Sequence, residues 1–252
     1  MTRLCRQSAI IILIISSLYS CGVYRQNVVN TPHFTAQNQA QIAGHVSFSG
    51  YDIQTSYSIT NKIGLLANYS TLGTKRKDYS STNYSIDRHY FSEFGLGYYS
   101  LKDVTKIREV FILAGQGMTS RFSTGGSNTS NISATTTPYF ENSSSLNYTR
   151  FVLQADFGKR EEKIEYSFSP RIFLINFYNI EDNNTLINSI QSKTFLWSDI
   201  SLTAKYSFLK YFKINGQIHV TLPITGFHQA YFDSSPFNLS LGVLMNLPFH
   251  KE

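Results

Sequence analysis

The sequence has little cysteine: Cys5 and Cys21 are the two present, and both fall near the N-terminus. Cys5 lies in a stretch that resembles a removable export signal. The one cysteine that would remain cannot form an internal disulfide, so a disulfide-stapled domain is excluded.

Long apolar runs are also absent after the N-terminus, so the sequence predicts no transmembrane helix. Charged residues make up 15% of the chain and aromatic residues another 15%, with a mean hydropathy of −0.18. A slightly negative hydropathy is typical of a membrane β-barrel, because outward apolar and inward polar residues alternate and cancel in any window. The length suits one domain.

Strong charge bias and chemical motifs are missing too. The 22 basic and 16 acidic residues are scattered, and no basic helix or dense basic face is visible, so we predict no nucleic-acid partner. We find no Gly-x-Ser-x-Gly, no metal-ligand spacing and no phosphate loop, and we therefore predict neither a cofactor nor a metal.

The first twenty residues are typical of a lipoprotein signal. A basic start precedes a short apolar stretch at residues 9–15, which is too short to cross a membrane as a helix. Leu18-Tyr19-Ser20-Cys21 then resembles a bacterial lipobox, which predicts Cys21 as the lipid attachment site and new N-terminus. An ordinary secretory signal with an incidental cysteine is the alternative.

Residues 21–39 are polar and aperiodic, and we interpret them as a tether between the lipid and a barrel at residues 40–250. An alternating pattern of apolar and polar residues begins near Ile42 and indicates strands. A turn about Asn61 would pair Tyr57 with Leu65 and Gln54 with Asn68.

The last stretch, Pro236 to Phe249, shows the alternation most clearly. Leu241 and Val243 would face lipid, while Ser240 and Gly242 would face the lumen. This apolar face is about long enough to cross a bilayer as a tilted strand, and the pattern resembles the C-terminal signal of outer-membrane barrels.

The whole pattern predicts a closed, antiparallel, up-and-down transmembrane β-barrel of all-β class, with ten strands, or eight as the fallback. Apart from the first connection, a tight turn at Ser49-Gly50-Tyr51, short links alternate with long ones, as periplasmic turns alternate with outer loops in bacterial barrels. The predicted outer loops are Lys75 to Asp87, Ser123 to Asn147, Asn179 to Lys193 and Thr225 to Ser235. Pro170 and Pro223 each predict a bulge or a frayed segment.

Charged side chains of both signs are expected on the lumen face. They are Glu93, Arg150, Asp156, Glu165, Arg171, Asp199 and Lys205. We favour a salt-bridged filling over a narrow pore, because about eight strands give an interior just filled by side chains and ten should leave little spare room. His45 and His219 would be polar filling in the same lumen.

An enzyme at the outer rim is the alternative from another class. Histidines are expected there at His89 and His228, the latter near Asp233 and Ser234. Serine is so frequent in this chain that such a set arises by chance. A lipid-tethered soluble barrel is a third option, but its outer face should be polar, which fits the pattern poorly.

The lipobox, the tether and the run from Gln54 to Tyr69 resemble the small outer-membrane β-barrel lipoproteins common in Bacteroidota. The resemblance implies an integral outer-membrane protein with no established activity, so no site residues carry over. We expect a structural or surface-interaction role. The expected partners are outer-membrane lipid, lipopolysaccharide and the barrel assembly machinery. Since an even strand count returns both ends to one side, we expect the lipidated N-terminus on the periplasmic side.

We predict that Cys21→Ala abolishes incorporation of labelled fatty acid into the protein. The barrel itself is expected to be integral, so the variant should still fractionate with the outer membrane. Unchanged labelling would contradict the assignment of Cys21.

Overall fold

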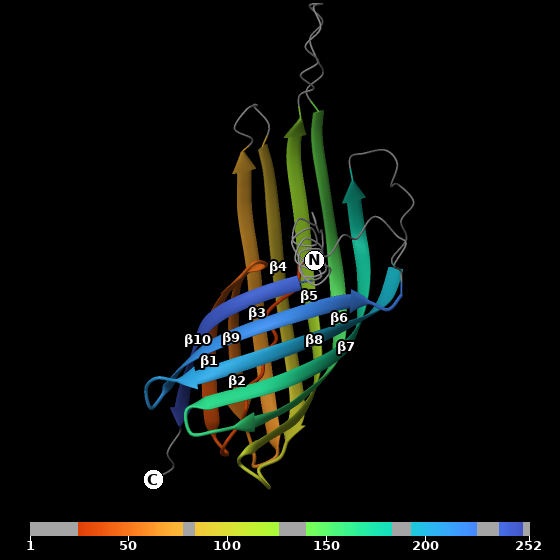
Figure 1. Cartoon of the computed structure of the whole chain (residues 1–252). Helices are drawn as coiled ribbons and strands as arrows, with labels where there is room; N and C mark the ends of the chain where they lie inside the picture. Colours follow the sequence, from red (N-terminus) through yellow and green to blue (C-terminus); the bar gives the residue numbers. More distant parts are fainter. Residues whose placement is uncertain (1–24, 78–83, 126–139, 183–192, 226–236, 249–252) are drawn as a thin grey trace, which may run out of the picture.

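Alternating residues place the chain in one antiparallel sheet that closes on itself, as a computed structural model shows (Figure 1). The structure describes residues 25–77, 84–125, 140–182, 193–225 and 237–248. The strands are β1 (Gln39–Ser47), β2 (Gly50–Ser58), β3 (Ile63–Lys77), β4 (Tyr84–Tyr99), β5 (Lys106–Gly125), β6 (Phe140–Arg160), β7 (Ile164–Asp182), β8 (Lys193–Ser207), β9 (Phe212–Pro223) and β10 (Phe237–Pro248). The predicted ten-stranded barrel is therefore confirmed. None of the described residues belongs to a helix that is long and apolar enough to cross a membrane.

Closure comes from the pairing of the first and last strands. β1 pairs with β10 from Gln39↔Pro248 to Ser47↔Ser240. Each strand otherwise pairs with its neighbours in sequence. The β2–β3 hairpin, predicted from a turn about Asn61, has the expected register, with Tyr57 opposite Leu65 and Gln54 opposite Asn68. Closure pairs every strand on both sides around the barrel, which is what a sheet in lipid requires. Above it, β3 beyond Thr71 is paired only with β4, and β7 beyond Phe177 only with β6.

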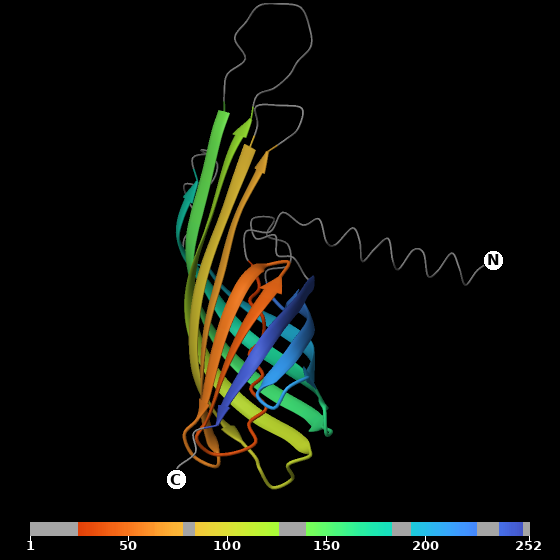
Figure 2. The same ribbon diagram turned by 90° about the vertical axis from the view of Figure 1, so that its left-hand side faces the viewer.

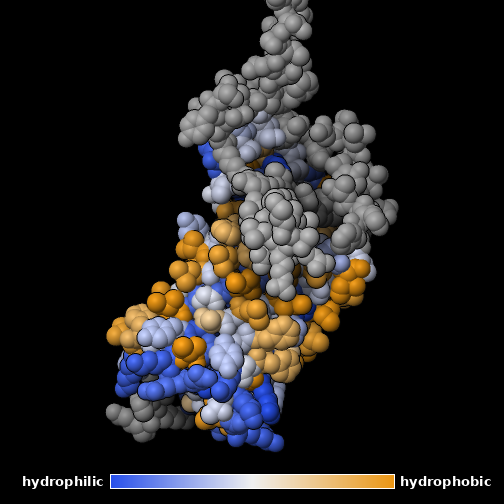
Figure 3. All heavy atoms as spheres, in the orientation of Figure 1, coloured by the Kyte–Doolittle hydropathy of each residue, from blue (hydrophilic) through white to orange (hydrophobic). Residues whose placement is uncertain are grey.

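The outer surface of the barrel is apolar and the inner surface is largely polar. Phe94, Ile112 and Leu241 point outward and are 71%, 66% and 63% exposed. Figure 3 shows such side chains forming a band, with hydrophilic residues gathered below it at one end. Soluble proteins rarely expose a continuous apolar surface of this size. The band thus identifies a transmembrane barrel.

Tyrosines border the apolar band toward both ends. Tyr51, Tyr69 and Tyr90 lie toward the end with the long links, while Tyr98 and Tyr206 lie toward the opposite end, and all five are exposed. Aromatic girdles at these two levels are a feature of membrane barrels, because the ring prefers the interface between hydrocarbon and water.

The two ends of the barrel are built differently. The β2–β3, β4–β5, β6–β7 and β8–β9 links and both ends of the strand series lie at one end, which we call the short-turn end. The long links and the tight β1–β2 turn lie at the other, the long-link end, where β3 to β7 rise well above the remaining strands as a curved wall (Figures 1 and 2). These five strands extend into segments that we expected to be loops, since β5 runs on to Gly125 and β6 begins at Phe140.

One glycine and two prolines occupy special positions in the strands. Gly50 begins β2 with a φ of 124°, and a Cβ there would lie 2.3 Å from the Thr71 carbonyl oxygen. The tight β1–β2 turn therefore requires glycine. Pro170 lies inside β7 and interrupts pairing with β6 without shifting the register, and Pro223 ends β9. The one register shift between β6 and β7 lies at Ser145/Asn147 instead.

The segment that we expected to be a tether lies inside the barrel. Residues 25–35, here called the threaded segment, run along the lumen before β1 begins (Figure 2), and residues 26–34 are all buried. This differs from the sequence-based interpretation of a linker outside the barrel. A ten-stranded barrel is wider than its own inward side chains fill, and the threaded segment occupies the remaining space.

Two leucines on the outer surface provide a test of membrane insertion. Leu241 lies in the apolar band and is 63% exposed, while Leu209 lies in the short β8–β9 link and is 59% exposed. Arginine on the lipid face costs about 2–4 kcal/mol near the midplane, so Leu241→Arg should lower the urea midpoint or block assembly. The matched control Leu209→Arg should leave both unchanged. Heat-modifiable gel mobility and urea titration in lipid vesicles measure this, and equal tolerance of both variants would exclude lipid contact at Leu241.

Candidate functional site in the barrel lumen

The threaded segment crosses the lumen from one end to the other. Arg25 lies 3.9 Å from Asp87, near the start of β4 at the long-link end. The last residues of the threaded segment lie beside Gln39 at the short-turn end, where the Gln39 side-chain oxygen accepts from the Thr35 N–H at 2.9 Å. Nine buried residues thus connect the two ends of the barrel.

An extended segment without a neighbouring strand leaves its backbone N–H and C=O groups without partners, which is costly in a buried site. Here the amide of Gln217 on β9 takes the place of a strand. It accepts from the Val29 N–H at 2.8 Å and donates to the Val29 carbonyl at 2.9 Å. Gln217 therefore pairs with Val29 as a strand residue would.

Other lumen side chains bind the remaining backbone groups of the segment in the same way. Asp52 accepts from the Val28 N–H at 3.1 Å, and Gln54 donates to the Val28 carbonyl at 2.7 Å. Gln154 donates to the Asn30 carbonyl. Lys205 donates to the carbonyls of Thr31 and Pro32, and Arg160 donates to that of His33. The polar lumen face that the sequence predicts is thus a surface that binds a peptide backbone.

The segment bends sharply at His33. Its φ of 56° lies in the left-handed region, which is uncommon for a residue other than glycine. The bend turns two successive N–H groups to one side, as in an anion-binding nest. Both meet the Glu109 carboxylate, His33 N–H at 3.2 Å and Phe34 N–H at 2.7 Å. Glu109 therefore holds the bend, and the Phe34 ring lies against Gly64, where a Cβ would be only 2.3 Å away.

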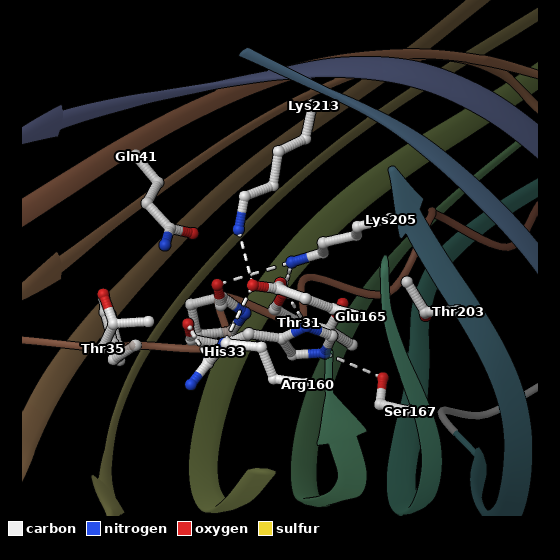
Figure 4. A network of polar contacts seen from close by, with 12 residues as sticks. Thr31, His33, Thr35, Gln41, Arg160, Glu165, Ser167, Thr203, Lys205 and Lys213 are labelled. Atoms are coloured by element: carbon white, nitrogen blue, oxygen red, sulfur yellow. Dashed lines mark hydrogen bonds and ion pairs between the residues drawn. The ribbon is translucent and has the colours of Figure 1, made fainter. Parts of the chain in front are cut away.

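The His33 side chain is held by a network of its own (Figure 4). Its Nδ1 lies 3.2 Å from Glu165 and its Nε2 lies 2.8 Å from the Ser167 hydroxyl. Glu165 also accepts from Arg160 at 2.9 Å and from Lys213 at 2.7 Å. Glu165 thus pairs with two cations, and β6, β7 and β9 are tied together through it.

Serine, histidine and a carboxylate in this order also resemble a catalytic triad. His33 is itself part of the threaded segment and is fully buried, and Ser167 is 4% exposed. A substrate carbonyl beside the Ser167 hydroxyl would need space that the segment occupies. The geometry therefore supports positioning of the segment rather than hydrolysis.

A second charged cluster lies farther along the lumen. Glu93 accepts from Arg150 at 2.6 Å and from Arg171 at 3.2 Å, and Arg171 is 3.7 Å from Asp199. Arg150 also donates to the Asn27 side-chain oxygen at 2.7 Å, so the cluster contacts the threaded segment. Two cations and two carboxylates cancel, and removing one member of such a buried set typically costs about 3–5 kcal/mol.

An aromatic layer in the lumen is the part of the site that the sequence pattern did not reveal. It contains Phe91, Phe111, Leu113, Tyr148, Phe173, Phe177, Phe195 and Trp197. The Arg150 guanidinium lies 4.2 Å from the Phe91 ring centroid and 5.4 Å from that of Phe173, so the rings stabilise the buried charge. β5 is apolar on both faces here, so the alternation of apolar and polar residues is lost. This loss of alternation is the sequence signal that could have indicated the layer.

The predicted lumen residues lie where the alternation placed them. The expected charged side chains Glu93, Arg150, Asp156, Glu165, Arg171, Asp199 and Lys205 are all buried, as are His45 and His219. Within the described part of the chain, no group of side chains could hold a metal ion.

The expected rim residues fall largely outside the part of the chain that the structure describes. His89 points into the lumen and lies 2.7 Å from the Tyr148 hydroxyl. His228, Asp233 and Ser234 lie outside the described residues, and so does the expected lipid site Cys21.

No family model and no curated protein sequence matches the chain. Among solved structures, it is similar to the translocator domain of the autotransporter NalP from Neisseria meningitidis, with a TM-score of 0.47 and 9% identity over 84% of this chain and 86% of that one. It is also similar to the N-terminal β-barrel domain of Pseudomonas aeruginosa OprF, with a TM-score of 0.35 and 13% identity over 84% and 98%. The NanC porin gives a TM-score of 0.33 and 11% identity over 82% and 100%. The function must be inferred from the chain's own side chains.

We predict that Gln217→Leu loosens the threaded segment. The substitution leaves the buried N–H and C=O of Val29 unpaired, and each such group costs about 1–3 kcal/mol. Gln41→Leu is the matched control, since Gln41 is equally buried on β1 and its described bond is a 3.4 Å contact from Ser56. Urea midpoints in lipid vesicles should fall clearly for Gln217→Leu and little for Gln41→Leu. Equal midpoints would show that Gln217 does not hold the segment.

Proposed function

We propose that the protein is an outer-membrane β-barrel lipoprotein whose own N-terminal segment seals its lumen. The threaded segment carries this proposal, because its buried backbone is bound by side chains from the surrounding strands. A segment held at so many points is a fixed part of the fold. The barrel therefore acts as a membrane-embedded support and not as a passage.

The apolar band and the short-turn and long-link ends support an outer-membrane location. Closed barrels with short turns on one side and long loops on the other are the form that bacterial outer-membrane proteins take. The long-link end would then face the outside of the cell, with the wall of β3 to β7 standing above the membrane surface.

Acylation of Cys21 completes the lipoprotein proposal, and the lipobox supports it. The Cys21 thiol would displace the headgroup phosphate of a phospholipid donor, forming a thioether to diacylglycerol and releasing the headgroup. Water would then hydrolyse the Ser20–Cys21 peptide bond and free the new N-terminus.

A surface-interaction role follows from the position of the wall. Arg88, on the outer face of β4 near its start, is exposed at a level above the apolar band. A cation there suits contact with the phosphates of lipopolysaccharide. We keep lipopolysaccharide and the barrel assembly machinery as proposed partners.

A narrow pore is the competing function, and conductance separates the two. The full-length protein in a planar bilayer should show no ion-conducting steps, whereas a variant lacking residues 25–35 should conduct. A known porin provides the positive control for the bilayer. Steady conductance by the full-length protein would contradict the sealed lumen, even if the shortened variant fails to fold.

A further inference from the structure

The direction of the threaded segment determines from which end the chain enters the barrel. Contacts along the segment move steadily from one end to the other. Arg25 meets Asp87, Val28 meets Asp52 and His33 meets Glu165. Asp87 and Asp52 lie near the long-link ends of β4 and β2, while Glu165 is the second residue of β7 at the short-turn end. The chain therefore enters the lumen at the long-link end.

Arg25 lies far from the short-turn end. Asp87, its partner, is twelve residues from Tyr99, which ends β4 at that end. Twelve strand residues span roughly 40 Å, and the usual barrel tilt of about 35–45° leaves roughly 30 Å of height. That height matches the full hydrocarbon thickness of a bilayer, about 30 Å.

Cys21 is only four residues before Arg25. A fully extended chain of this length reaches at most about 14 Å. Cys21 therefore cannot return to the short-turn end, where the even strand count led us to expect the N-terminus. Its reach confines it to the side of the long links.

The barrel wall is low at the β1–β2 turn, because β1 and β2 are much shorter than β3 to β7. Val28 is bound to Asp52, two residues from the tight turn that joins β1 to β2. The outward side chains beside this turn are apolar, since Val46, Phe48 and Tyr51 are each about 60% exposed. Arg25, three residues before Val28, is the first residue that the structure describes, and the four residues from Cys21 to Arg25 span at most about 14 Å.

We propose that the Cys21 lipid anchor lies on the external side of the outer membrane, with its acyl chains in the outer leaflet. The proposal rests on the acylation of Cys21 in the proposed function. The lipid anchor and the short-turn end of the barrel would then lie on opposite sides of the membrane. The threaded segment is the part of the chain that crosses between them.

A single added thiol tests this topology in intact cells. Val23→Cys lies two residues after the anchor, Arg88→Cys marks the long-link end, and Asn61→Cys marks the short β2–β3 turn. An impermeant maleimide applied to intact cells should label Val23→Cys as strongly as Arg88→Cys. Asn61→Cys should react only after the outer membrane is permeabilised. If Val23→Cys instead behaves like Asn61→Cys, the external anchor is excluded.

An epitope inserted between Val23 and Tyr24 gives a second readout that does not depend on acylation. Antibody should bind it on intact cells, and binding only after permeabilisation would overturn the proposal. Failure of the lipidation step is seen separately, because an unacylated Cys21 would make the denatured wild-type protein react with maleimide. The epitope result would then still decide the side on which the chain leaves the barrel.

Discussion

Backbone hydrogen bonding inside the lumen is the constraint on which this structure depends. A buried peptide group without a partner is costly, and the threaded segment has no strand beside it. Gln217, Gln54 and Glu109 supply the missing partners from three different strands. The side chains that fill the barrel and the side chains that bind the segment are therefore the same.

The outer face of the sheet obeys the complementary requirement. Lipid offers no hydrogen bonds, so every strand must be paired on both sides, and the β1–β10 pairing achieves this. A closed sheet of ten strands is wider than its inward side chains can fill. The threaded segment fills the space that closure creates, and side chains of the Glu93 cluster and of the His33 network hold it there.

The arrangement also has a consequence for assembly. The segment runs through the lumen from the Glu93 cluster, which contacts Asn27, to the His33 network. An N-terminus that carries acyl chains would not pass through this region once the sheet has closed. The barrel should therefore close around the segment, with β1 and β10 joining last. Folding and sealing would then be one event.

The alternation of apolar and polar residues by itself determined the fold class, the number of strands and the register of the β2–β3 hairpin. It also determined that residues such as Arg150 and His219 face the lumen. The reason is that lipid and lumen impose opposite polarity on successive residues of every strand. The aromatic lumen layer escaped this rule, because Phe111 and Leu113 are apolar on the face where polarity was expected. The place of residues 25–35 was decided by the tertiary structure alone. Their polar, aperiodic sequence is equally typical of a solvated linker, and their partners lie on strands up to 188 residues away.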